Sequence, residues 1–337
     1  MTTTEAPIGV TFASFQALGM RTGLEVARTA DALGYSSFWT AETVGQEAFA
    51  TLAAVGSVAP TMGLGTGVLA LQLRTPMLAA MGAATLQDLS PEIDVLLGVG
   101  ISSPVVVGRW HGGEYGDRPI ARVREYLELT RACLSGEPVT YEGEFYHCSR
   151  FRLGVRLDGR RPKLVLGALN ERMLGLAGEL ADGVLLNYLP ASAVPWCIEQ
   201  VRAAEARAGR PPGECTVHAY VHVGVTDRDA ALPHARQDLF SYAVVPAYAR
   251  AFERAGFVDE VAEVRAAHSA GDRAAAVAAI SDAMVDAIDI CGDAHTVSAA
   301  VRSYRDAGVD VPVIMPLPWG EDRRGVIDAT VVAAAHA

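Results

Sequence analysis

The chain has 337 residues, of which 50% are hydrophobic and 20% are charged, and its formal net charge is −11 at pH 7. This length fits one α/β barrel with insertions, and so apolar a chain can bury a large core. The acidic balance and the lack of a basic stripe argue against nucleic acid as a partner.

Cysteine usage and the first residues bear on the compartment. The cysteines are scattered, odd in number and without C-x-x-C spacing, so we expect reduced thiols, no disulfide framework and no zinc site. Residues 1–12 lack the basic and apolar segments of a signal peptide, and no stretch is apolar for the ~18 residues of a membrane helix. We therefore expect a soluble cytoplasmic protein with no membrane partner.

Strand-like and helix-like runs alternate along the first part of the chain. Each expected strand is a short apolar run, and each expected helix has apolar residues at helical spacing. The strand–helix pairs are 8–12 with 23–33, 37–40 with 47–58, 64–70 with 76–89, and 93–99 with 121–134. Pro76 stands in the first turn of its helix, where proline is tolerated.

The alternation resumes after residues 138–153, which have the pattern of a β-hairpin. Further strands are expected at 163–166, 183–187, 216–225 and 311–315, with helices at 172–180, 192–208 and 325–335. Eight strands with helices between them favour a closed (β/α)8 TIM barrel over an open doubly wound sheet. We expect a single domain over residues 1–337.

Residues 229–289 interrupt the alternation between the seventh and eighth strands. Their patterns are helical, and roughly 85 residues separate the two strands, far more than a usual loop. We expect a helical insertion that covers the barrel mouth as a lid or a substrate wall. The candidate pocket residues, each of which would also suit core packing, are Phe12, Trp110, Phe240, Tyr242, Tyr248 and Trp319.

Glycines end the third strand in the run GLGTG, residues 63–67. The run lacks G-x-G-x-x-G spacing and a well-placed acidic partner, so a dinucleotide loop is not indicated. Glycines at a strand end instead indicate close backbone approach to a ligand, and a planar ring at the barrel mouth is one such ligand. Thr66 and Gly67 are therefore candidate cofactor-binding residues, and the family resemblance described below adds Val68.

Two side chains at strand ends are candidates for proton transfer. Glu42 directly follows the second strand, and His111 lies in the Gly-rich loop after the fourth. Glu42 could equally cap a helix, and His111 could simply bond a backbone carbonyl. His218 and His222 share a face of the seventh strand without a third ligand at suitable spacing, so we expect no metal site.

The turn after the fifth strand contains Gly167, Ala168, Leu169 and Asn170. The first backbone N–H groups of the helix that follows could cradle a phosphate, although a plain loop is the alternative. The chain has no G-x-S-x-G, H-E-x-x-H or Walker motif, so a hydrolase or a kinase is not indicated. A barrel that binds a large planar phosphorylated cofactor, and leaves redox chemistry to it, remains.

Nearly the whole chain resembles the bacterial luciferase-like flavin and deazaflavin oxidoreductases. The resemblance rests on FWTAE, LGTGVLALQLRTPMLAAMGAATLQDLS, RPIARVREYLELTRACLSGEPVTYEGEFY, RMLGLAGELADGVLLNYLP and ISDAMVDAIDICGDAHTVSAAVRSYRDAGVD. Their order is similar to the branch that uses coenzyme F420, which includes methylenetetrahydromethanopterin reductase.

The resemblance implies a site and an assembly. It implies a non-proline cis peptide between Gly67 and Val68 against the deazaflavin ring, with Glu42 near that ring. It implies that the loop 167–170 binds the phosphate of the cofactor. It also implies that Ser102 and Ser103 belong to a polar cofactor-binding loop. It also implies a homodimer.

The chain departs from the family at two places, and three functions stay open. Ser90-Pro91-Glu92-Ile93-Asp94 replaces S-x-G-R, and ISSPVVV replaces a loop with Glu and Asn, so the proton donor is unassigned. The lead hypothesis is hydride transfer between C5 of F420 and an organic substrate, with Glu42 or His111 handling the proton. The alternatives are an FMN-dependent monooxygenase supplied by a partner reductase, and a catalytically silent flavin-binding homologue.

Overall fold

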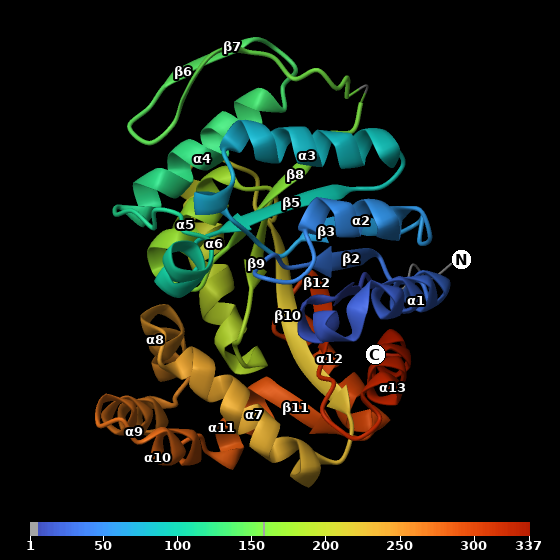
Figure 1. Cartoon of the computed structure of the whole chain (residues 1–337), viewed down its shortest axis with the longest axis vertical. Coiled ribbons are helices and arrows are strands. Elements are labelled where there is room, and N and C mark those ends of the chain that lie inside the picture. Colours follow the sequence, from blue (N-terminus) through green and yellow to red (C-terminus); the bar gives the residue numbers. More distant parts are fainter. Residues whose placement is uncertain (1–5, 158) are drawn as a thin grey trace.

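A computed structural model describes residues 6–157 and 159–337, and in it eight parallel strands close into a barrel (Figure 1). The strands are β1 (Gly9–Thr11), β2 (Ser37–Thr40), β3 (Gly63–Thr66), β5 (Val95–Gly100), β8 (Lys163–Gly167), β9 (Gly183–Leu186), β10 (Thr216–Val225) and β12 (Val311–Pro316). Because β10 pairs with both β9 and β12, the ring has no free edge. The predicted TIM barrel is confirmed.

Helices that connect the strands lie outside the barrel (Figure 1). They are α1 (Gly19–Ala32), α2 (Ala48–Gly56), α3 (Pro76–Leu89), α4 (Pro119–Cys133), α5 (Glu171–Leu180), α6 (Val194–Arg207), α12 (Ala294–Asp306) and α13 (Arg323–Ala335). Local chemistry sets where they begin. Thr75 accepts the Leu78 N–H ahead of Pro76 in α3, and Asn170 accepts the Met173 N–H in α5.

The strands separate two layers of core. Alternate residues of a strand point to opposite sides, so Val217, Ala219 and Val221 of β10 pack outward with the helix layer. Tyr220 of the same strand belongs to the barrel interior, whose buried residues are Trp39, Leu96, Val165, Leu185, Tyr220, Val313 and Met315. The inward side of β10 therefore leads from the interior up to the barrel mouth.

The third expected strand is broken in two. β3 ends at Thr66, and β4 (Leu69–Ala70) resumes against β5, with Leu69 opposite Val99. The peptide bond between Gly67 and Val68 is cis, as the resemblance implies. The break turns the backbone of Gly67 toward the barrel mouth, where it lines a cavity.

The helical insertion follows β10 and has a core of its own. Its helices are α7 (Arg228–Ala243), α8 (Pro246–Arg254), α9 (Val258–Ser269), α10 (Arg273–Ala278) and α11 (Asp282–Ile288). They gather at one end of the molecule in Figure 1, and their buried core includes Tyr188 from the loop after β9. The insertion is thereby attached to the barrel mouth through an aromatic contact.

The insertion ends in a strand that the helical pattern did not predict. Asp289–Gly292 forms β11, which pairs in parallel with β10 from His222 to Val225. β9 pairs with β10 only over Thr216 to Ala219, so the carboxyl-terminal half of β10 can pair with another strand on that side. The expected helical segment 229–289 is therefore one residue too long, because Asp289 belongs to this strand.

Three smaller features complete the fold. The expected hairpin is present as β6 (Val139–Glu142) and β7 (His147–Phe151), which are antiparallel. A short π-helix, Val105–Trp110, follows β5 where only a loop was expected. Within the described residues, no helix combines the length and the apolar character needed to cross a bilayer.

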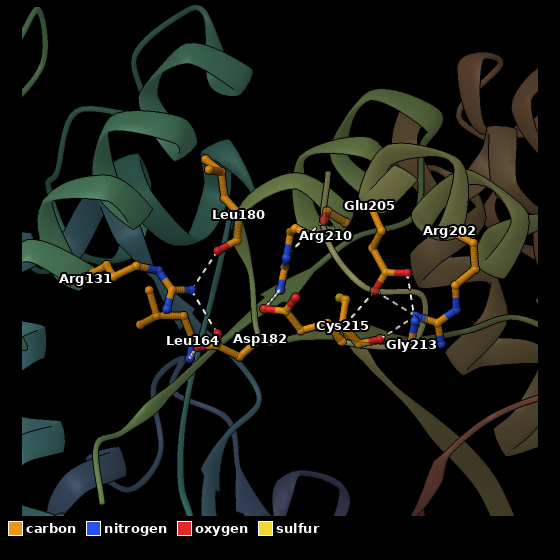
Figure 2. Close-up of polar contacts among 11 residues, drawn as sticks. Arg131, Leu164, Leu180, Asp182, Arg202, Glu205, Arg210, Gly213 and Cys215 are labelled. Atoms are coloured by element: carbon orange, nitrogen blue, oxygen red, sulfur yellow. Dashed lines mark hydrogen bonds and ion pairs between the residues drawn. The ribbon is translucent and has the colours of Figure 1, made fainter. Parts of the chain in front are cut away.

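A polar network ties the strands together at their amino ends, opposite the cavity. The Asp182 side chain accepts the N–H of Leu164 at 2.7 Å, and Arg131 contacts the same carboxylate at 3.0 Å (Figure 2). The Asp182 carbonyl accepts the N–H of Thr216 at 3.0 Å. Glu205, fully buried, accepts from Arg202 and from two loop N–H groups (Figure 2). All carboxylate oxygens of Asp182 and Glu205 are thus bonded to neighbouring residues of the fold. We therefore assign a stabilising role to this end of the barrel.

Candidate active site

A cavity of about 300 Å³ opens at the carboxyl ends of the barrel strands. Loops after five strands and helix α7 of the insertion contribute to its wall, among them Ser14, Ala41, Gly67, Asn187, Asp238 and Trp319. Asp238 is the only carboxylic acid, and no basic side chain occurs, among the described residues that line it. A pocket at this end of a TIM barrel is where active sites lie.

Gly67 and Tyr220 meet at the base of this cavity. The Tyr220 hydroxyl donates to the Gly67 carbonyl at 2.9 Å, and it accepts from the Thr11 hydroxyl at 3.4 Å. A Cβ at residue 67 would stand 2.0 Å from the Tyr220 hydroxyl oxygen, so only glycine fits. The backbone can therefore approach a bound ring closely here.

Replacing Tyr220 with phenylalanine is expected to lower the free energy of unfolding by about 1 kcal/mol, because the buried Gly67 carbonyl loses its donor. Urea unfolding of both proteins measures the difference. Tyr115→Phe, at an exposed site, is the matched control. Equal losses in the two variants would contradict a special role for the Tyr220 bond.

Polar side chains from three separate segments meet above Tyr220. His222 lies near the carboxyl end of β10. It contacts Asp289 Oδ1 through Nδ1 at 3.0 Å and Asn187 Oδ1 through Nε2 at 2.8 Å. Asp289 is fully buried and its Oδ2 has no partner among the described residues. Burial lowers the pKa of His222 to about 4 and raises the pKa of Asp289 well above its usual range.

Asp238 of α7 completes the group on the cavity side. Its Oδ2 accepts the hydroxyl of Tyr188 at 2.7 Å, and the Tyr188 ring packs on Tyr242 with centroids 3.7 Å apart. Burial is the largest cause that raises the pKa of Asp238 to about 6. A carboxyl with such a value in a cavity is suited to acid–base work near neutral pH.

Glu42 lies beside this cavity but is bound to a cation. Arg74 contacts both its carboxylate oxygens, at 3.2 and 2.9 Å, and also pairs with Glu47. Glu47 is the capping residue of helix α2, and Glu42 also accepts the N–H of its first residue, Ala48, at 3.4 Å. Only the preceding residue, Ala41, lines the cavity.

The residues expected after β5 lie at or near the surface. His111 is exposed, and its Nε2 lies 2.5 Å from the Thr43 carbonyl, which is the simple backbone contact that the sequence left open. Trp110 is 56% exposed. Ser103 accepts the Val106 N–H at the start of the π-helix, and Ser102 is half-buried.

The expected phosphate loop has a basic neighbour that the sequence did not indicate. Gly167 ends β8, Ala168 donates to the Leu185 carbonyl, and Asn170 caps helix α5. Arg254 of α8 donates to the Leu169 carbonyl at 2.6 Å, which places a guanidinium beside the first turn of α5. A helix start with an adjacent arginine is a suitable anion site.

Thr66 and Val68 hold the cis segment in place. The Thr66 hydroxyl donates to the Gly98 carbonyl and accepts the Gly98 N–H, both at 2.8 Å. A Cβ at Gly100 or Gly167 would stand 2.9 or 3.3 Å from the Val68 side chain. Thr66 therefore acts through the neighbouring strand, while Gly67 lines the cavity.

The expected pocket aromatics divide into two groups. Tyr242 and Trp319 line the cavity, and Tyr248 packs edge-on against Tyr188 and Tyr242. Phe12 is a correction: it is fully buried against Phe15 and Phe38 in the helix layer. Phe240 is also a correction, because it is buried within the insertion, where its ring contacts His268.

Sequence reasoning missed most of the polar group. Asn187 and Tyr188 end the sixth strand in LLNYLP, and polar residues at a strand end were a usable signal. Asp238 and Asp289 lie in helical patterns that carry no such signal. His222 was considered only with His218, whose ring instead packs against Trp39 at 5.1 Å, so the two histidines have separate surroundings.

Known proteins resemble this chain over most of its length. A family described as "Luciferase-like monooxygenase" matches residues 8–311. A Mycobacterium tuberculosis protein named "putative coenzyme F420-dependent oxidoreductase" is 31% identical over 312 residues, covering 86% of this chain and 89% of its own. The 5,10-methylenetetrahydromethanopterin reductase of Methanolobus tindarius is 27% identical over 306 residues, covering 89% and 91%.

The coenzyme F420 dependent tetrahydromethanopterin reductase from Methanopyrus kandleri has a similar structure. The TM-score is 0.81 at 22% sequence identity, over 98% of this chain and 97% of that chain. At this identity the likeness concerns the fold.

Proposed function

The chain belongs to the luciferase-like monooxygenase family, and from that premise we propose that it is a coenzyme F420-dependent oxidoreductase. In this proposal a hydride passes between the deazaflavin and an organic substrate. Membership makes the chain an oxidoreductase, and the name of the Mycobacterium tuberculosis relative supports F420 as the cofactor. The observation that carries the proposal is the cavity lined by the backbone of Gly67 at the carboxyl ends of the strands.

The residues present fit a planar phosphorylated cofactor. Gly67 leaves no side chain between its backbone and the cavity, since a Cβ there would fill the space up to Tyr220. Arg254 and the start of α5 would hold the phosphate. When bound, the deazaflavin supplies a carbon that gives or takes a hydride.

The chain itself would orient the reactants and keep water out. Tyr242, Trp319 and Met315 provide apolar wall, and the insertion that carries Tyr242 covers the barrel mouth. The proton that accompanies the hydride needs a separate donor. Glu42 is bound by Arg74 and His111 by a backbone contact, so neither is free without rearrangement.

Titration with F420 and with FMN, followed by tryptophan fluorescence, tests the proposal. Trp319 lines the cavity, so a bound ring should quench its emission. We expect micromolar binding of F420 and at least roughly tenfold weaker binding of FMN. Arg254→Ala should weaken F420 binding by about tenfold, because a charged hydrogen bond to phosphate contributes about 1.5–3 kcal/mol.

Arg250→Ala is the matched control, since Arg250 lies on the same helix and is exposed. Equal effects of the two arginine variants would remove the phosphate assignment. Tighter binding of FMN than of F420 would overturn F420 dependence. It would favour the monooxygenase that the family description names, with oxygen uptake in the presence of a reductase as the next assay.

A further inference from the structure

We propose that Asp238 is the acid that protonates the substrate in this cavity, and that a neutral Asp289–His222 pair behind it lets it hold that proton. The inference rests on the proposed function, because it names the proton donor and the substrate class for the hydride transfer. Four features of the described residues carry it: the position of Asp238, the lack of a cation beside it, the hydrogen-bond partners of the Asp289–His222 pair, and the groups around Asp238.

Asp238 is placed to touch a substrate. It lines the cavity together with Gly67 and Tyr220. Its Oδ2 is occupied by the Tyr188 hydroxyl at 2.7 Å, and no partner of its Oδ1 is found in the described part of the chain. One carboxyl oxygen is thus held in place, and the other is available to the cavity.

Asp238 differs from Glu42 in having no arginine or lysine beside it among the described residues. Arg74 holds both oxygens of Glu42. By contrast, residues 6–157 and 159–337 provide no arginine or lysine that pairs with Asp238 or Asp289. A buried carboxyl without a cation favours its protonated form, because burial penalises the charge.

The hydrogen bonds of His222 indicate where the protons lie in the pair. Asn187 Oδ1 already accepts the Tyr188 N–H at 3.0 Å, so it is an oxygen, and His222 Nε2 must donate to it. Burial lowers the pKa of His222 and so favours its neutral form, which then has a bare Nδ1 that accepts from Asp289 at 3.0 Å. Asp289 therefore carries the proton, in agreement with its raised pKa and the lowered pKa of His222.

The pair is neutral in this arrangement, and that decides the state of Asp238. Polar atoms of His222, Asp238 and Asp289 lie within 4.8 Å of one another. A protonated His222 at that range would favour the carboxylate of Asp238, whereas a neutral His222 does not. The other groups facing Asp238 are the hydroxyls of Tyr188 and Tyr242, both uncharged since burial raises their pKa values.

The substrate class follows from this chemistry. A neutral acceptor with a polarised C=O or C=N bond suits a cavity with one acid and no base among its described lining residues. As the substrate carbon gains the hydride, the π pair moves to the heteroatom, the Asp238 O–H bond breaks and the heteroatom–H bond forms. When bound, reduced deazaflavin would supply the hydride and would release its ring N–H proton to solvent. Asp238 would regain a proton from solvent after product release.

The first arm of the test uses cofactor-free protein, so it does not depend on the proposed function. Carbon-13 NMR of labelled aspartate carboxyls should show one group that titrates near pH 6, and that signal should be missing in Asp238→Asn. Asp259→Asn, an exposed site in the same insertion, should keep it. In the wild type the Tyr188 hydrogen bond stabilises the carboxylate of Asp238. Tyr188→Phe removes this bond and should therefore raise the midpoint pH of the titration.

The second arm measures turnover of reduced F420 with cyclohexanone and with 1-pyrroline as carbonyl and imine probes. Asp238→Asn should lower kcat about 100-fold or more at an unchanged Kd for F420. In the wild type, kcat should fall as pH rises through about 6, and Tyr188→Phe should move that limb upward. Asp259→Asn should match the wild type.

Several results would overturn the inference. A midpoint for Asp238 near its usual 3.8 would do so, as would turnover of Asp238→Asn within about threefold of wild type. A kinetic loss confined to Glu42→Gln or His111→Asn would return the proton to those residues. Failure of the wild type to bind F420 would contradict the proposed function, and the titration of the cofactor-free protein would still decide the state of Asp238.

Discussion

Gly98→Ala is expected to lower the free energy of unfolding by about 3 kcal/mol, the largest effect of a single methyl group that we foresee in this chain. A Cβ at residue 98 would stand 1.9 Å from the Thr66 carbonyl oxygen and 3.1 Å from its carbon. The obstacle is backbone, so no side-chain rotation relieves it. Strands β3 and β5 would have to separate, which also breaks the two bonds between Gly98 and the Thr66 hydroxyl.

Urea unfolding of the variant and the wild type measures this loss. Gly154→Ala is the matched control, because a Cβ there meets nothing within 4 Å and its backbone is not left-handed. A Gly98→Ala protein within about 1 kcal/mol of the control would mean that the barrel yields easily at this point. Since Gly67 follows Thr66, loss of F420 binding in a folded Gly98→Ala protein would also support the assignment of the ring site.

Acid is expected to destabilise the protein through His218, by about 3 kcal/mol between pH 6.5 and pH 4. This ring lies 5.1 Å from Trp39 inside the barrel, and its Nδ1 has no partner among the described residues. Burial, with a smaller effect of Lys163, lowers its pKa from 6.5 to about 4. The folded state thus favours neutral His218, and the stability it contributes is complete above pH 6.5 and lost as pH falls toward 4.

His218→Gln tests this, because glutamine is polar but does not titrate. The free energy of unfolding of the wild type should fall more steeply with acid than that of the variant, by about 3 kcal/mol over this range. Asp238 acts in the opposite sense, since its raised pKa favours the folded state at low pH, but it is present in both proteins. His147→Gln, at an exposed site on β7, should keep the wild-type slope; parallel slopes for His218→Gln would refute the assignment.

The sequence by itself determined the architecture. Short apolar runs and helical spacing predicted the barrel strands in order, and Ser37–Thr40, Thr216–Val225 and Pro76–Leu89 have the predicted bounds. The resemblance located the cis peptide at Gly67–Val68. The strand and helix bounds could be predicted because they depend on residues close together in the sequence. The cis peptide could be predicted because the order of motifs along the chain resembles that of a known family.

The sequence predicted the structure less well where it depends on strand pairing or packing with a distant segment. Residues 64–70 read as one apolar strand, and only the pairing with β5 shows that it divides into β3 and β4. Asp289 reads as the end of a helix, and it becomes a strand because the upper half of β10 accepts another neighbour. Phe12 is an aromatic residue of the kind that lines pockets, but its side chain packs in the core between the strands and the helix layer.

Only the tertiary structure decided which side chains form the candidate site. Tyr188 and Asp238 are 50 residues apart, and His222 and Asp289 are 67 apart, in an order with no short-range pattern. Their contacts require a closed barrel, a β11 strand beside β10, and an insertion folded over the mouth. The charge state of a carboxyl depends on burial and on the absence of a nearby cation, and both are properties of packing between distant segments.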